Sequence, residues 1–195
     1  MKILQVSTTA QRFGAGIAAY RLHKGLRSIG ADSWMLVNSV SQREDFILSP
    51  TNNLGKIMAR LYPELDRIPG HISRSPPGVV SSSWVPNRLI SRIKAQSADI
   101  VNLHWVNGGF MRIEALSKIR HPIVWTLHDM WAFSGGEHYL GESTRYKEGY
   151  SVSNRPDLET GLDVNPVARA VGPGASHGGS ILYAAAIRIP LFGSL

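Results

Sequence analysis

The sequence contains no cysteine among its 195 residues, which excludes a disulfide scaffold, a cysteine nucleophile and a thiolate metal site. Long apolar runs are also missing, because no stretch approaches the ~20 residues that span a bilayer. The N-terminal residues 1–6 lack the pattern of a signal peptide, since Gln5 interrupts a short apolar stretch that carries only Lys2. We therefore expect a cytoplasmic protein.

Lysine is absent after residue 150, where three arginines match three acidic residues. The net charge of +7, from 21 basic and 14 acidic residues, therefore lies in the first 150 residues. Such a balance attracts anions such as nucleic acid, acidic membrane or phosphorylated small molecules. No lysine- or arginine-rich run and no RNP-type motif is present, so we predict no nucleic-acid partner. A hydrophobic content of 43% is typical of a globular chain with a buried core.

The first forty residues have the pattern of a strand–helix–strand unit. Residues 2–7 predict a buried strand, residues 7–16 a polar loop with glycines, and residues 32–37 a second strand. Gly30 stands where a glycine commonly ends a helix. The apolar residues that recur with roughly the helical period between these strands are Ile17, Tyr20, Leu22, Leu26 and Ile29.

The middle of the chain is less regular. Residues 38–50 predict a loop with one short strand at 46–48, and residues 54–65 predict a basic amphipathic helix. Proline, serine and glycine dominate residues 69–86, which indicates a long surface connection.

A second unit follows, with a helix that begins near Arg88, a strand over 100–105, a short helix over 111–119 and a strand over 122–127. Together the two units predict an α/β fold, a Rossmann-like parallel sheet flanked by helices. The expected core residues are Ile3, Leu4, Val6, Leu22, Leu26, Leu36, Ile100, Val101, Leu103, Val124 and Leu127.

The C-terminal residues have no amphipathic period. We expect one folded domain over 1–158 and a weakly specified or disordered tail over 159–195, in which the glycine-rich stretch 172–179 is cut first by a protease. The alternative is that residues 181–192 add a helix or strand to the edge of the sheet.

His104 and His128 each end a predicted strand, and neighbouring strands would place the two side chains within reach of each other. Ligands of open parallel sheets bind at the carboxyl ends of the strands, where a histidine can take a proton from a hydroxyl or donate to a phosphate. The alternative is a core histidine that bonds to the backbone. Asp129 can orient an imidazole, bind a sugar hydroxyl or cap the next turn. No histidine pair at i, i+4 has a nearby acid, so we predict no metal site.

Gly14 and Gly16 lie in the predicted loop before the first helix. Glycines let a backbone approach a phosphate, and a helix N-terminus presents free N–H groups to it. The full dinucleotide fingerprint and a Walker lysine are both missing. The alternative is a tight turn that only lets the helix pack. Trp105, Trp125 and Trp131 suit either stacking on a sugar or a place in the core.

Four stretches, at residues 1–7, 14–16, 99–110 and 126–131, together resemble the N-terminal domain of bacterial family 4 glycosyltransferases. These are retaining enzymes of the GT-B fold that act in exopolysaccharide or lipopolysaccharide assembly.

The resemblance extends over residues 1–158. It is closest to a branch with a Gly-Gly-x-His-Tyr stretch and an Arg-Tyr pair, which are here residues 135–139 and 145–146. Relatives in that branch carry cysteines in this region, and the matching positions here are Glu137, Ser143, Tyr150 and Ser153.

The resemblance implies transfer of a sugar from a nucleotide sugar to a saccharide or lipid-linked acceptor. It implies no cofactor besides this donor substrate and no metal, because such enzymes neutralise the diphosphate with protein groups. His104 would be the catalytic residue near the acceptor hydroxyl, Gly14 and Gly16 would approach the diphosphate, and His128 and Asp129 would line the same cleft. Peripheral association with the inner face of a membrane fits the same family.

The GT-B fold has a second domain that grips the donor, and the residues after 158 are too few to form one. We therefore expect a truncated chain that binds nucleotide weakly and has no turnover by itself. The alternatives are a noncatalytic nucleotide- or sugar-binding module and, third, another nucleotide-binding Rossmann enzyme. The donor, the acceptor and the oligomeric state stay open.

Overall fold

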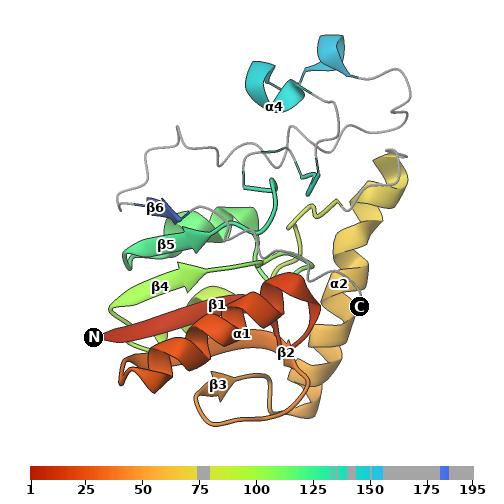
Figure 1. The fold of residues 1–195 in the computed structure, drawn as a ribbon. Helices are drawn as coiled ribbons and strands as arrows, with labels where there is room; N and C mark the ends of the chain where they lie inside the picture. The colour runs from red at the N-terminus through yellow and green to blue at the C-terminus, as the bar shows by residue number, and fades with distance from the viewer. Residues whose placement is uncertain are drawn as a thin grey trace, which may run out of the picture.

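The strands form a single parallel sheet in the order β3-β2-β1-β4-β5-β6 (Figure 1). The computed structural model describes residues 1–73, 80–132, 134, 136–139, 144–149, 151–155 and 181–184. This architecture confirms the predicted Rossmann-like α/β fold. The strands are β1 (Lys2–Ala10), β2 (Asp32–Val40), β3 (Ile47–Leu48), β4 (Ile100–Leu103), β5 (Ile123–Thr126) and β6 (Ile181–Ala184).

Helices and short helical turns connect the strands. Helix α1 links the neighbouring strands β1 and β2, and η1 links the neighbours β4 and β5, whereas α2 runs alongside the domain (Figure 1). The helical elements are α1 (Phe13–Ser28), α2 (Asn53–Ser73), α3 (Leu89–Lys94), η1 (Ile113–Lys118), α4 (Arg145–Glu148) and η2 (Val152–Asn154).

The direction of the strand order reverses between β1 and β4. From β1 the chain moves outward to β2 and β3, then returns to place β4 against the other side of β1. In open α/β sheets such a reversal leaves a crevice at the carboxyl ends of the two strands, and ligands bind there.

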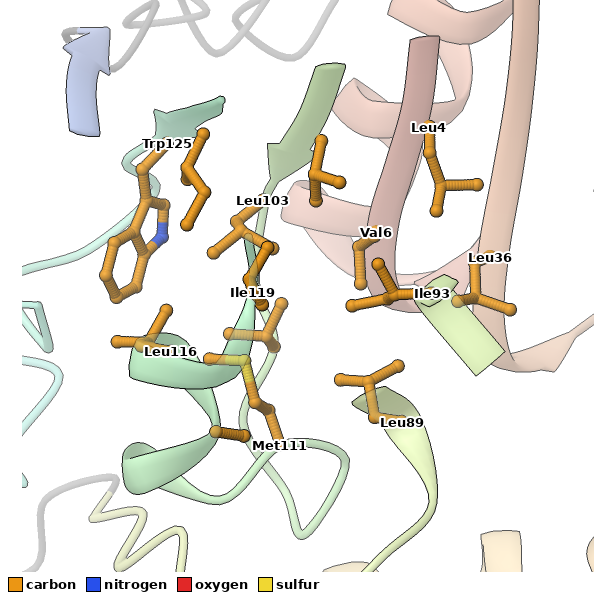
Figure 2. Packing of buried hydrophobic residues seen from close by; sticks show 14 of the residues in the cluster. Leu4, Val6, Leu36, Leu89, Ile93, Leu103, Met111, Leu116, Ile119 and Trp125 are labelled. Atoms are coloured by element: carbon orange, nitrogen blue, oxygen red, sulfur yellow. The ribbon is translucent and has the colours of Figure 1, made fainter. Parts of the chain in front are cut away.

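The two faces of the sheet differ in polarity. Leu4, Val6 and Leu103 project from one face into the main core, where Leu89 and Ile93 of α3 pack against them (Figure 2). The opposite face carries Met35 and Val37 beneath α1, but also a row of polar residues on β1 and β4. Buried polar groups need hydrogen-bond partners, so this second face is held together by polar contacts as well as by packing.

Helix α1 packs through a different face from the one predicted. Its buried residues are Gly16, Ala19 and His23, whereas the predicted residues Leu22 and Ile29 are 40% and 78% exposed. Small residues on the packing face let the helix lie close to the sheet. This close packing, rather than the periodic apolar residues, decides which face of the helix is buried. The expected end of the helix is confirmed, because Gly30 has a φ of +82° and its N–H donates to the Arg27 carbonyl oxygen at 3.0 Å.

The other expected core residues vary in burial. Fully buried are Leu4, Val6, Leu36, Val101 and Leu103. Partly buried are Ile3, Leu26, Ile100, Val124 and Leu127.

Two segments differ from the sequence prediction in extent. Helix α2 continues to Ser73, past two prolines, and therefore includes the start of the predicted surface connection. The later part of that connection is not a surface loop throughout, since Ser81, Ser83 and Val85 are buried. The path of this proline- and serine-rich segment is therefore determined by its packing against the core and α2.

Part of the predicted tail belongs to the sheet. Residues 181–184 form β6, which pairs in parallel with β5 from Ile123 to Thr126, as the alternative prediction for this segment proposes. The expected first cleavage stretch, 172–179, lies outside the described residues. The domain boundary at residue 158 stays a prediction.

The contact between α1 and β1 yields a matched pair of substitutions. A Cβ added at Gly16 would lie 2.4 Å from Thr9 Oγ1 and 2.9 Å from the Thr9 carbonyl oxygen, whereas one added at Gly14 meets nothing within 4 Å. We expect Gly16→Ala to lower the free energy of unfolding by about 1–3 kcal/mol. Gly14→Ala should leave it unchanged or raise it by up to about 1 kcal/mol. Urea titrations of both variants test this, and equal stabilities would contradict the packing described.

Candidate functional site

The candidate site lies at the carboxyl ends of β1, β4 and β5. The backbone N–H of Thr8 donates to the Trp105 carbonyl oxygen at 2.7 Å, and Thr8 Oγ1 donates to the Asn107 carbonyl oxygen at 2.8 Å. These two bonds join the end of β1 to the segment that follows β4. They therefore bind the two strands together at the edge where the strand order reverses.

His104 and His128 meet at this edge. His104 directly follows β4 and His128 lies two residues beyond β5, so adjacent parallel strands bring them together. The distance from His104 Nδ1 to His128 Nε2 is 3.1 Å, and the rings are stacked with centroids 5.4 Å apart. The sequence prediction that these two histidines lie within reach of each other is confirmed.

A buried polar network lies behind the histidine pair. Gln5 Oε1 accepts hydrogen bonds from Asn102 Nδ2 and from His104 Nε2, both at 2.8 Å. Asn102 Oδ1 in turn accepts a hydrogen bond from Thr126 Oγ1 at 3.1 Å. The network therefore crosses three strands, from β5 through β4 to β1, and ends at the histidines.

The network determines where the imidazole protons lie. An amide oxygen only accepts, so His104 Nε2 must carry the hydrogen in the bond to Gln5. A neutral His104 then presents a bare Nδ1, which requires His128 Nε2 to donate. A neutral His128 keeps an unprotonated Nδ1, to which none of the described residues donates a hydrogen bond.

Burial keeps both imidazoles neutral near pH 7. Burial, with a smaller contribution from the His128 charge, lowers the pKa of His104 to about 3. Burial also lowers the pKa of His128, against the opposing charge of Asp129. His104 is only 2% exposed and both its ring nitrogens are engaged, whereas His128 is partly exposed. His128 is therefore the member of the pair that a ligand can touch.

Asp129 does not orient His128. Its Oδ2 accepts from Trp105 Nε1 at 2.9 Å and pairs with His138 Nδ1, and its Oδ1 accepts from the Trp131 backbone N–H at 3.0 Å. The carboxylate therefore caps the turn after β5 and binds it to the segment that carries His138, as one of the alternatives for Asp129 proposed.

Ser81, His138 and Asp129 are connected in the order of a hydrolytic triad, since His138 Nε2 lies 2.9 Å from Ser81 Oγ. Ser81 and His138 are 4% and 2% exposed. The small cavity beside Asp129 is lined by neither of them. A buried hydroxyl with no access cannot attack a substrate, so we interpret this chain of bonds as structural.

The space beside the histidine pair is narrow. The cavity lined by His104, His128, Asp129, Trp105 and Trp131 measures about 10 Å³, which holds roughly one water molecule. A larger cleft of about 550 Å³ lies between α2 and α3. A ligand larger than water must therefore lie over His128 at the edge.

The predicted glycine loop is instead the start of a helix. Strand β1 continues to Ala10 and α1 begins at Phe13, so Gly14 and Gly16 lie in the first turn of α1. Gly16 is buried against Thr9 and Gly14 is exposed, so only Gly14 remains open to a ligand.

The turn before α1 has two features that suit an anion. Arg12 stands at the helix N-terminus and makes no side-chain capping bond, which leaves N–H groups free. Gln11 and Phe13 have φ of 63° and 56°, and such left-handed conformations are costly for these residues and often accompany functional sites.

Comparisons with family models, curated proteins and solved structures found no match to this chain. The resemblance to family 4 glycosyltransferases, the roles of the site residues and the partners therefore stay predictions. Within the described ranges, no three or more histidine, aspartate or glutamate side chains gather as metal ligands would. None of the described helices is long and apolar enough to cross a bilayer.

Sequence reasoning missed the residues that support the histidine pair. Gln5, Asn102 and Thr126 belong to strands that are predicted from their apolar residues, and that pattern assigns no role to their polar side chains. The signal is an alternation of polar residues at every second position, with Gln5 and Ser7 on β1, and with Asn102 on β4 and His104 directly after it. His138 lies in the Gly-Gly-x-His-Tyr stretch, where no local pattern predicts its pairing with Asp129.

The proton positions can be read by nitrogen-15 NMR of the histidine side chains. At pH 7 we expect both His104 and His128 to be neutral, with the proton on Nε2 and a bare Nδ1. Thr126→Val, which removes only the far end of the network, should leave this pattern unchanged. The opposite tautomers would mean that the Gln5 amide is turned around, so that its NH2, which has no partner in the described part, donates to His104.

Two buried neutral histidines make the fold sensitive to acid. Burial lowers the pKa of His23, with help from Arg27 and Lys24, to about 4, and that of His104 to about 3. Below pH 6.5 the unfolded chain binds protons that the folded chain does not, so stability falls as the pH decreases. We expect a loss of about 2 kcal/mol per histidine at pH 5.

Chemical unfolding at pH 7.5 and pH 5 tests this. His23→Gln should lose about 2 kcal/mol of the difference between the two pH values, whereas the exposed His71→Gln should retain all of it. The same pH dependence in both variants would contradict a buried neutral His23.

Proposed function

We propose that this chain is the acceptor-side half of a retaining glycosyltransferase of the family 4 type. In this proposal it binds a saccharide or lipid-linked acceptor through a hydroxyl group at His128. The observation that carries the proposal is the neutral pair of His104 and His128, 3.1 Å apart at the carboxyl edge beside the reversal of strand order. Ligands of this fold class bind at that edge.

The chemistry of His128 suits a hydroxyl ligand. Its Nε2–H donates to His104, which leaves Nδ1 as a neutral acceptor for the hydrogen of an incoming hydroxyl. A hydroxyl held in this way keeps a lone pair for attack on the anomeric carbon of a donor sugar. His104 touches no substrate in this arrangement and acts as a positioning residue, which maintains the orientation and tautomer of His128.

The donor diphosphate would approach the N-terminus of α1. Free N–H groups, the positive end of the helix dipole and the exposed Arg12 all favour a negatively charged group there. Gly14 is the glycine that the proposal assigns to this contact. Gly16 is buried by the packing of α1 on β1 and has no part in it.

A second candidate function is a noncatalytic sugar- or nucleotide-binding module. The observation that favours it is the small size of the cavity beside the histidines, about 10 Å³. A site of this kind would contact a ligand on one side only. The two candidates share the ligand class and differ in whether transfer follows.

Binding and transfer can be measured separately. We expect saccharide acceptors to shift the NMR signals of His128 with millimolar affinity, about −4 kcal/mol, and His128→Ala to abolish binding. His71→Ala, on the exposed face of α2, serves as the matched control. Nucleoside diphosphates should shift Gly14. Saccharide binding away from His128, or none, would refute the proposal.

Transfer is tested with a panel of nucleotide sugars by the release of nucleoside diphosphate in the presence of a bound acceptor. We expect this chain by itself to show acceptor binding without release. Release that disappears in His128→Ala would favour the complete enzyme over the binding module. Release that persists in His128→Ala would contradict the assigned role of His128.

A further inference from the structure

Helix α2 carries an apolar stripe that no described part of the chain covers. Its five aliphatic residues follow one another at spacings of three, four, four and three, which places them on one face of a helix. Each is at least 38% exposed, so the stripe faces away from the domain. They are Leu54 (65%), Ile57 (52%), Leu61 (45%), Leu65 (38%) and Ile68 (43%).

The spacings of the stripe are the same when α2 is read from either end. Leu61 stands at the centre, with Ile57 and Leu65 each one turn away from it and Leu54 and Ile68 each two turns away. When two such helices cross at Leu61 in opposite directions, Ile57 of each faces Leu65 of the other, and Leu54 faces Ile68. The stripe therefore complements a second copy of itself, as an interface between identical subunits about a twofold axis requires.

The charged residues beside the stripe fit the same antiparallel arrangement. Exposed side chains follow one another along one side of the stripe, namely Lys56, Arg60, Glu64 and Arg67. A twofold axis through Leu61 places Glu64 of one helix midway between Lys56 and Arg60 of the other, about 3 Å from each along the helix axis. The axis repeats this contact, so each dimer holds it twice. Parallel pairing would instead bring like ends of the two helix dipoles together.

A tryptophan widens the stripe. Trp84 is 44% exposed and its Nε1–H donates to the Leu65 carbonyl oxygen at 3.1 Å, so the indole lies against α2 beside Leu65. In the antiparallel arrangement Leu65 faces Ile57 of the second copy, and the indole borders that contact. Tryptophan is enriched among the interface residues that carry most of the binding free energy.

The opposite side of α2 is fixed on its own domain. Asp66 is 1% exposed, and Asn38 Nδ2 of β2 donates to the Ala59 carbonyl oxygen at 3.1 Å. The stripe is therefore presented by a helix that is already held in place, which lowers the entropy that association costs.

We propose that α2 joins two copies of this chain into an antiparallel, twofold-symmetric dimer through the stripe and Trp84. Association removes the five aliphatic side chains of each copy from water, and this burial drives it. The dimer does not depend on the function proposed for His128.

Analytical ultracentrifugation of the full chain at increasing concentration tests the dimer. We expect a monomer–dimer equilibrium with a dissociation constant on the order of 10–100 μM, since one helix and one tryptophan from each copy form a small interface. A chain that stays monomeric at about ten times this concentration would assign the stripe to another occupant and overturn the proposal.

A substitution at the twofold axis shows whether the stripe forms the interface. Leu61→Glu places two carboxylates against each other at the centre of the contact and should weaken the dimer about tenfold or more. Leu22→Glu, at a leucine of α1 that is 40% exposed, is the matched control and should dimerise as the parent does. A dimer that survives Leu61→Glu would mean that another surface pairs. Circular dichroism and urea unfolding verify that each variant is folded.

The absence of cysteine makes the orientation of the two helices measurable. In Leu61→Cys the two introduced thiols face each other, so a short bifunctional maleimide should link the copies. Leu54→Cys should not link to itself, because the two thiols lie about 21 Å apart along the antiparallel helices. A mixture of Leu54→Cys and Ile68→Cys should link. Linkage of Leu54→Cys to itself would contradict antiparallel pairing, and no linkage of Leu61→Cys would contradict the dimer.

Discussion

The seam between β1 and β4 is the constraint on which the candidate site depends. Gln5 lies fully buried at this seam, and its Oε1 accepts from Asn102 on the neighbouring strand β4 and from His104 directly after it. A buried amide oxygen without partners is costly, so the two bonds restrict how β4 can lie against β1. The same oxygen requires the hydrogen of His104 to be on Nε2 and thereby makes His128 the donor in the pair. One side chain thus links strand pairing to the chemistry at the edge.

A second set of bonds determines the course of the chain beyond β5. Asp129 accepts from Trp105 and from the Trp131 backbone and pairs with His138, which in turn contacts Ser81. These partners come from segments far apart in the sequence. Because they surround the residue next to His128, they limit where that imidazole can point. His138 and His128 therefore have different roles. His138 supports the turn after β5, whereas His128 stays accessible at the surface of the domain.

Helix α2 packs against the turn that follows β4. Burial of its carboxylate, Asp66, raises the pKa of this group above its usual value, and the neighbouring backbone N–H groups of Gly109, Ser83 and Trp84 oppose that rise. A helix that buries one face can leave aliphatic residues exposed on another, as α2 does with Leu54, Ile57, Leu61, Leu65 and Ile68.

The amino-acid sequence by itself determined the order of the main elements, the parallel α/β class and the meeting of His104 with His128. These follow from local periodicity and from the rule that parallel strands share an edge. Only the tertiary structure decided which face of α1 is buried, because the close approach of Gly16 to Thr9 outweighs the apolar residues Leu22 and Ile29. It also decided that Gly14 and Gly16 are helical, that Asp129 binds two tryptophans and that His104 lies behind His128. These features depend on contacts between residues distant in sequence, and local patterns carry no information about such contacts.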